Sequence, residues 1–177
     1  MTYSILNSPY DDSITGIKLG DSIIPLNLKN RDYQEILDDI IENGDSNWDV
    51  DIPESIQTDA DTKLFGQQVE AYKTAIARLE HYQLSVGVPE SSKIIVIGQE
   101  WNEETEEMQD ITETVVTPAI EPLEATVEVT STDFDTDTTI TETVPNPLIV
   151  KDDEERTAAQ DIINNTPQAV KDHVDGV

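Results

Sequence analysis

The stretch from Leu64 to Val86, LFGQQVEAYKTAIARLEHYQLSV, has apolar side chains at sustained heptad spacing. The members of this seam are Phe65, Val69, Tyr72, Ile76, Leu79 and Val86. They follow one another in steps of four and three residues, except that Gln83 occupies the position between Leu79 and Val86. This period is typical of a helix with one narrow apolar stripe. The stretch predicts a helix about 35 Å long, at about 1.5 Å per residue. Two interpretations stay open: the stripe packs on the chain's own domain, or it pairs with copies of itself.

On the N-terminal side of this helix, residues 1–44 predict a small strand-and-helix module. Short apolar groups alternate with turn residues over residues 1–29, which is typical of two or three strands, and Leu19 to Ser22 is the clearest turn. Asn30 is suited to cap a helix, and Gly44 is suited to end it. Apolar side chains repeat at helical spacing between them, at Tyr33, Ile36, Leu37 and Ile40.

An acidic linker is expected at residues 45–63, which hold five Asp, one Glu and Pro53 with no basic residue before Lys63. Trp48 lies inside it and is expected to dock back on a neighbouring surface. The central helix then covers residues 64–88, because Pro89 cannot continue a helix.

Residues 89–150 predict an acidic β-rich module. Ile94 to Ile97 reads as a strand, and the acidic run from Glu100 to Asp110 as a loop or an exposed helical turn. Thr and Val alternate around residues 126–130 and predict a strand with one solvent-exposed face. The chain is then expected to turn at residues 131–137 and to form a second strand at 138–144.

Residues 151–177 predict a C-terminal helical segment, with one helix from Glu154 to Asn164 and a shorter one that starts at Thr166 and Pro167. Together these elements predict an α+β fold.

The charge balance narrows the classes of partner. With 10 basic and 38 acidic residues the chain has a formal net charge of -28, which disfavours binding to nucleic acid or to an anionic membrane and favours cations or a basic protein. No cysteine is present, so disulfides and thiolate metal sites are excluded. The first residues lack a secretory signal, and no apolar run is long enough to span a bilayer. We expect a soluble protein made in the cytoplasm.

Several patterns were tested as chemical sites. Asp133, Asp135 and Asp137 have the spacing of a calcium loop, as do residues 45–51, but both lack the glycine and the bidentate glutamate that such a loop needs. His81 and His173 have no partner at ligand spacing, and the glutamates at 103–107 form a run of like charges rather than an enclosed acid-base pair. We therefore expect no catalytic, cofactor-binding or metal site, and no enzyme.

One segment carries a resemblance to a known family. The run Ile24-Pro25-Leu26-Asn27-Leu28-Lys29-Asn30-Arg31-Asp32-Tyr33-Gln34-Glu35-Ile36-Leu37, followed by Glu42-Asn43-Gly44-Asp45, resembles a segment of small tail and tail-fibre-associated structural proteins of tailed bacteriophages. Three later runs, at 117–127, 155–160 and 166–170, are similar to small structural proteins of marine cyanobacterial phages. The resemblance implies a virion accessory protein of the tail, baseplate or fibre region, made in the host cytoplasm, with no catalytic residues.

These observations lead to a functional prediction of protein-protein docking to other virion proteins, with homo-oligomerisation as a further possibility. The candidate interface residues are Tyr33, Ile36, Leu37, Ile40, Phe65, Val69, Tyr72, Ile76 and Leu79. Two alternatives remain: a tail-fibre assembly chaperone that is absent from the finished particle, and an acidic DNA mimic that inhibits a host protein.

Overall fold

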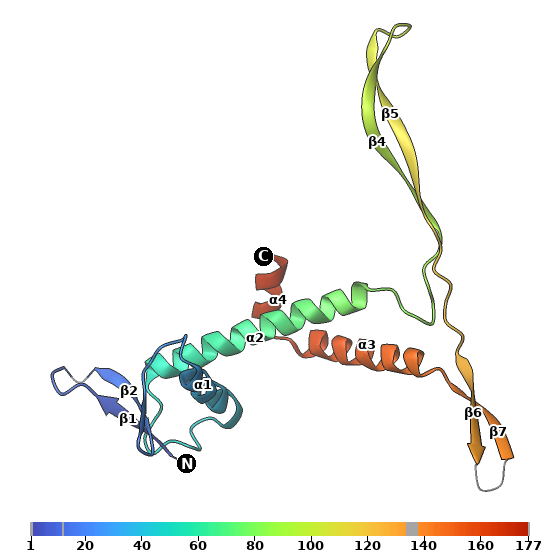
Figure 1. Cartoon of the computed structure of the whole chain (residues 1–177). Helices are drawn as coiled ribbons and strands as arrows, with labels where there is room; N and C mark the ends of the chain where they lie inside the picture. Colours follow the sequence, from blue (N-terminus) through green and yellow to red (C-terminus); the bar gives the residue numbers. More distant parts are fainter. Residues whose placement is uncertain (1, 12, 134–137, 177) are drawn as a thin grey trace. The chain divides into compact units, whose positions relative to one another are not determined.

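The computed structural model describes residues 2–11, 13–133 and 138–176. Within them the chain forms four helices and seven strands, all paired antiparallel, so the predicted α+β class is confirmed (Figure 1). The chain divides into a first unit, Met1–Lys73 with Thr166–Val177, and a second unit, Thr74–Asn165. The predicted N-terminal module, the predicted linker and the start of the central helix therefore belong to one unit, together with the last helix.

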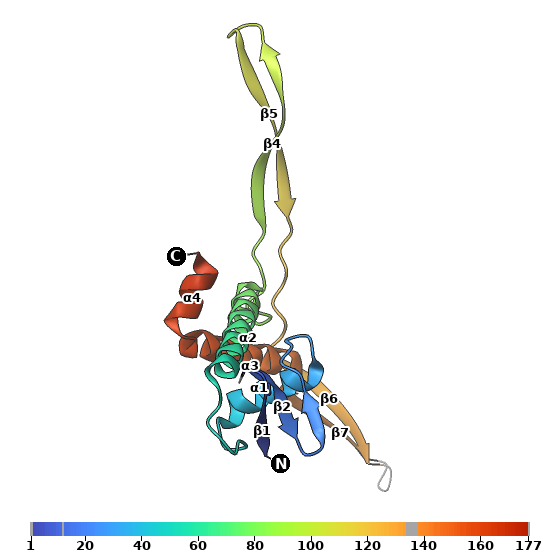
Figure 2. The same cartoon turned by 90° about the vertical axis from the view of Figure 1, so that its left-hand side faces the viewer.

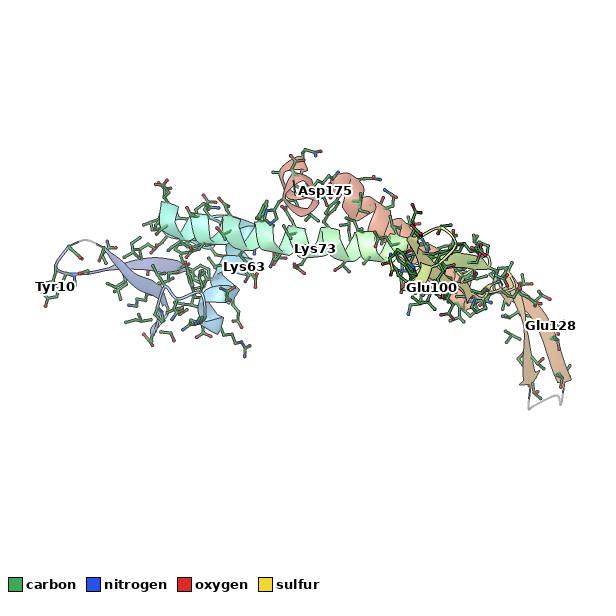
Figure 3. All side chains as sticks on the ribbon, turned by 90° about the horizontal axis from the view of Figure 1, so that it is seen from above. Tyr10, Lys63, Lys73, Glu100, Glu128 and Asp175 are labelled. Atoms are coloured by element: carbon green, nitrogen blue, oxygen red, sulfur yellow. The ribbon has the colours of Figure 1, made fainter. Side chains whose placement is uncertain are left out.

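The first unit begins with a three-stranded sheet. Its strands are β1 (Tyr3–Asn7), β2 (Ile14–Leu19) and β3 (Ser22–Ile24), in the order β1-β2-β3. Leu19 pairs with Ser22 across a two-residue turn in which Gly20 has φ 60°, a conformation that glycine adopts without steric cost. The predicted turn is confirmed. Tyr10 lies at the tip of the β1–β2 connection, 95% exposed (Figure 3).

Helix α1 (Arg31–Asn43) forms as the sequence predicts. The side-chain oxygen of Asn30 accepts hydrogen bonds from the backbone N–H groups of Asp32 and Tyr33, at 2.8 and 3.1 Å. These bonds satisfy donors that the first turn of a helix leaves free. At the other end, Gly44 has φ 63° and donates its N–H to the Ile40 carbonyl.

The core of the first unit is built where the sheet, α1 and the start of α2 meet. Its buried members are Ile17, Ile24, Tyr33, Ile36, Leu37, Ile40, Trp48, Ile56 and Ala60. The predicted docking of Trp48 is confirmed: its side chain is 9% exposed, and its ring centroid lies 5.3 Å from that of Tyr3.

Helix α2 (Glu54–Glu80) corrects both predicted boundaries of the central helix. It starts at Glu54, so residues 54–63 are helical and the prediction of a linker up to residue 63 is wrong. The Pro53 carbonyl accepts the N–H groups of Ile56 and Gln57, and the buried side chains of Ile56 and Ala60 give this acidic stretch an apolar face. The helix ends at Glu80, so Val86 lies outside it.

The second unit contains two separate two-stranded ribbons (Figures 1 and 2). The first is β4 (Ser91–Asn102) with β5 (Glu107–Thr117), and the second is β6 (Thr126–Asp133) with β7 (Thr138–Pro145). The acidic run at 100–110 is thus mostly strand, because Trp101 pairs with Met108 and Glu100 with Gln109 across the ribbon. The prediction of a loop or helical turn there holds only for residues 103–106.

The second ribbon has the predicted hairpin pairing, but neither of its faces is buried. Val127 and Val144 are only half-buried, and every other residue that the structure describes in β6 and β7 is exposed. Phe134, Asp135 and Asp137, which belong to the predicted turn and to one tested calcium pattern, lie outside the described residues.

The C-terminal helices differ from prediction at their starts. Helix α3 (Pro147–Asn165) begins before the predicted Glu154, because Pro147 suits the first helical position and the Asn146 side chain accepts the N–H of Leu148 at 3.1 Å. Helix α4 (Gln168–Asp175) has Pro167 rather than Thr166 at its N-cap, without a side-chain cap hydrogen bond.

Candidate functional site

The candidate interface residues on α1 are not available to a partner. Tyr33, Ile36, Leu37 and Ile40 are at most 4% exposed and lie in the core of the first unit. A protein could reach them only after that core had opened. Their prediction as docking residues is therefore wrong. Their helical spacing arises because this side of α1 packs into the core of the first unit.

The seam of α2 is also largely covered by the chain. Val69 and Tyr72 are buried, and Ile76 and Leu79 are half-buried. Phe65 is the most exposed of the five, and its ring packs edge-on against that of His173 in α4, with centroids 5.3 Å apart. Of the two interpretations left open, packing within the chain agrees with this burial better than a free oligomer seam.

Polar contacts join α2 to α1 around the core of the first unit. The Tyr33 hydroxyl donates to the Asp59 carboxylate at 2.7 Å, and burial, together with this bond, raises the pKa of the Tyr33 hydroxyl. The Lys63 ammonium donates to the Gln34 carbonyl and lies beside the Asp38 carboxylate, both at 2.7 Å. These polar groups are hydrogen-bonded or ion-paired to one another, so they stabilise the packing of α2 on α1.

In the second unit, Asp152 is the centre of an ion network between the end of α2 and α3. Its carboxylate is 5% exposed and accepts from Arg78, from Arg156 at 3.3 Å and from the backbone N–H of Leu84 at 3.2 Å. The hydrogen bond from Arg78 is the main reason that the pKa of Asp152 is lowered. Arg156 also donates to the carbonyls of Leu79 and His81, which lie at the end of α2. The network thus fastens the two helices and caps α2.

The histidines and one residue of the second calcium pattern are engaged in contacts with their neighbours. His81 is exposed and stacks on Tyr82, and His173 packs on Phe65. Asn47, from the second calcium pattern, donates to both carboxylate oxygens of Asp39. Among the described residues, no group of three or more His, Asp or Glu side chains is arranged to hold a metal ion. In the same part of the chain no helix is both long and apolar enough to cross a membrane.

The β4–β5 ribbon carries the most exposed apolar surface, and its register sorts the side chains onto two faces. Cross-strand partners share a face, and successive residues alternate between faces. Val96 pairs with Thr112 and Gly98 with Ile111, so Ile97 is the extra residue of a bulge. The Gln99 amide donates to Asp110 across the ribbon at 2.7 Å, which agrees with this assignment beyond the bulge.

We call one side the apolar face. Its large side chains are 53–68% exposed and are Ile94, Val96, Trp101, Met108 and Val116. Its other members are Ser92, Gln99, Asp110, Thr112 and Thr114, so it holds a single charged group. The opposite side, the charged face, has Lys93, Glu100, Glu107 and Glu113. This surface was not predicted from the sequence, because residues 108–116 show no regular apolar alternation and only the register of the two strands brings Met108 and Val116 onto one face.

The base of this ribbon is tied to the helical part of the second unit. Val88 and Ile120 exchange two backbone hydrogen bonds of 2.8 Å, and Leu123 donates to the Leu84 carbonyl at 2.9 Å. Gly87 has φ 70°, and a Cβ built there would lie 2.2 Å from the Ile120 carbonyl oxygen. Only glycine permits this close approach of the two chain segments.

The β6–β7 ribbon carries a different surface. Pairing places Thr130 opposite Thr141 and Thr132 opposite Thr139 on one face, and the hydroxyls of Thr130 and Thr141 lie 3.3 Å apart. Glu128 lies on the same face and is exposed (Figure 3). This face is polar and offers hydroxyl groups rather than apolar area.

The exposed surfaces of the two ribbons are therefore the candidate functional site, in place of the predicted helix faces. They suit contact with another protein, since each strand of a two-stranded ribbon has one edge without a strand partner among the described residues. Comparison of the chain with family models, with curated proteins and with solved structures gave no match.

Proposed function

We propose that this chain is a structural protein of a phage particle, in the tail, baseplate or fibre attachment region, and that it acts by docking its β ribbons onto other virion proteins. The observation that carries the docking proposal is the exposure of both faces of β4–β5. A two-stranded ribbon on its own is at best marginally stable in water, so one with five exposed large apolar side chains on one face needs a further protein surface. The resemblance of residues 24–37 to tail-associated proteins supports the location.

The charge distribution supports a protein partner with basic residues around the contact. Residues 94–150, which include almost all of both ribbons, hold fourteen acidic residues and no Lys or Arg. Such a surface repels phosphate backbones and attracts Lys and Arg side chains, which speeds encounter with a basic partner. Binding of this kind weakens as salt concentration rises.

The test is quantitative mass spectrometry of purified particles from infected cells that make the chain. The proposal predicts a constant ratio of this chain to the major capsid protein through successive purification steps. Absence from particles, with the chain abundant in the infected cells, would contradict a structural role and favour the assembly chaperone. Displacement of a host nucleic-acid-binding protein from DNA by the purified chain would instead favour the DNA mimic.

A further inference from the structure

We propose that the apolar face of the β4–β5 ribbon is covered by the same face of a second copy of this chain, with the two ribbons antiparallel. The inference assigns the apolar face to a second copy, which leaves the charged face and the β6–β7 ribbon for other virion proteins. It does not depend on the proposed function, since two copies can pair whether or not they enter a particle. It rests on the area of the face, on the distribution of charge along the ribbon and on the sizes of the side chains that would meet.

The area of the face is suited to a weak dimer. Strand β4 has 12 residues, which at about 3.3 Å each gives a ribbon about 40 Å long. Two strands and their side chains make the face about 10 Å wide, so each copy contributes a footprint of about 400 Å² before side-chain relief is counted. Two such faces can pack about 10 Å apart as in a β-sandwich, and their footprints together cover about 800 Å². This is below the about 1,200 Å² of standard stable interfaces and is typical of a weak association.

Charge determines which face pairs and in which direction. The apolar face has only Asp110, whose carboxylate already accepts from Gln99, whereas Glu100, Glu107 and Glu113 lie on the other face and stay in water. The tip of the ribbon is acidic, with Glu103, Glu104, Glu106 and Glu107. A parallel pair would bring two such tips together. An antiparallel pair separates them by about 40 Å, about five times the screening length of about 8 Å at physiological salt.

Side-chain sizes agree with the antiparallel arrangement. With Val96 and Thr112 at the centre of the face, a two-fold axis through this point places Trp101 and Met108 of one copy over Ser92 and Val116 of the other. The largest side chains of the face thus meet its smaller ones. Gln99 lies over Ile94 and Asp110 over Thr114, so the two Asp110 carboxylates do not face each other. Large against small side chains is the pattern that fills an interface without voids.

The chain offers a matched pair of variants to test the proposal. Val115 and Val116 are neighbours in β5, are 43% and 53% exposed, and lie on the charged and apolar faces respectively. Val116→Glu and Val115→Glu therefore add the same charge at nearly the same place on opposite faces. Sedimentation equilibrium of the full chain, from low micromolar to millimolar concentration, measures dimerisation of each.

We expect the wild-type chain and Val115→Glu to dimerise with similar dissociation constants, and Val116→Glu to raise the dissociation constant by roughly 100-fold or more, because each dimer buries this position twice. A wild-type chain that stays monomeric over the whole range would overturn the proposal. Equal weakening by both variants would overturn the assignment of the face. Circular dichroism at 222 nm shows whether the helices of each variant remain folded.

The direction of pairing has a separate readout. The chain has no cysteine, so Thr105→Cys at the ribbon tip accepts a single spin label. Antiparallel pairing predicts that the two labels in a dimer are about 40 Å apart or further, the length of the ribbon. A distance of less than half that value would show parallel tips and would overturn the proposed arrangement.

Discussion

Replacing Leu37 by alanine is expected to lower the free energy of unfolding of the first unit by about 3 kcal/mol. Leu37 is 0% exposed and lies in the cluster formed by the sheet, α1 and the start of α2. Truncation removes buried methyl groups and leaves a cavity, because neighbours such as Ile36 and Ile40 are held on the same helix and relax only in part. The loss is large beside the total stability of a small domain.

Urea denaturation followed by Trp48 fluorescence measures this loss, since Trp48 belongs to the same cluster. A Trp101→Phe background removes the signal of the only other tryptophan. The matched control is Leu28→Ala, at a leucine that is 57% exposed, for which we expect a change within about 0.5 kcal/mol. Equal stability of the two variants would show that α1 does not pack as described. Its apolar face would then again be a candidate docking surface.

Replacing Asp152 by asparagine is expected to lower the thermal midpoint of the second unit by several degrees. The variant leaves the Arg78 and Arg156 guanidinium groups close together without the carboxylate that both contact. Removal of one partner from a buried ion network is more damaging than removal of an exposed pair, because the remaining charges are poorly hydrated. The control is Asp153→Asn, at an exposed neighbour whose carboxylate accepts a 3.1 Å bond from Gln83.

The same network makes a prediction about pH. The pKa of Asp152 is lowered from its ordinary value of 3.8, so the folded state binds its proton more weakly than the unfolded state does. Its contribution to stability is therefore complete above the ordinary value and is lost as pH falls through the lower folded-state pKa. Thermal melts between pH 7 and pH 3 should show a constant gap between wild type and Asp152→Asn down to about pH 5, and a narrowing gap below about pH 4. A gap that widens in acid would contradict the assigned network.

The sequence predicted best where local chemistry decides structure. Asn30 and Gly44 mark the ends of α1 by their own hydrogen bonding and backbone freedom, and both act as expected. The start of α2 is not evident from the sequence, because Asp, Glu and Pro are typical of linkers. Pro53 in fact precedes the first helical turn, where a proline needs no hydrogen-bond donor, and Ile56 and Ala60 meet a core that only the tertiary fold assembles.

The candidate site was harder to predict, for a related reason. Helical spacing of apolar residues indicates that a face is buried but not what buries it, so Tyr33 and Leu37 were assigned to a partner when they belong to the core. The reverse happened in β4–β5, where polar side chains stand between the apolar ones of the same face and the bulge at Ile97 changes the face of the residues after it. The sequence therefore shows no regular alternation there. The register of the two strands is needed to bring Ile94, Trp101 and Val116 onto one face.

We propose that the exposed β4–β5 ribbon is completed by another protein surface, the same ribbon of a second copy of the chain. Amide hydrogen exchange followed by mass spectrometry tests it on peptides that cover residues 91–117, in dilute and in concentrated solutions of the full chain. We expect the ribbon amides to exchange quickly in dilute solution, while α1 stays protected, and to become protected as concentration rises. Ribbon amides that are already as protected as α1 in the dilute chain, with no change on concentration, would contradict the claim.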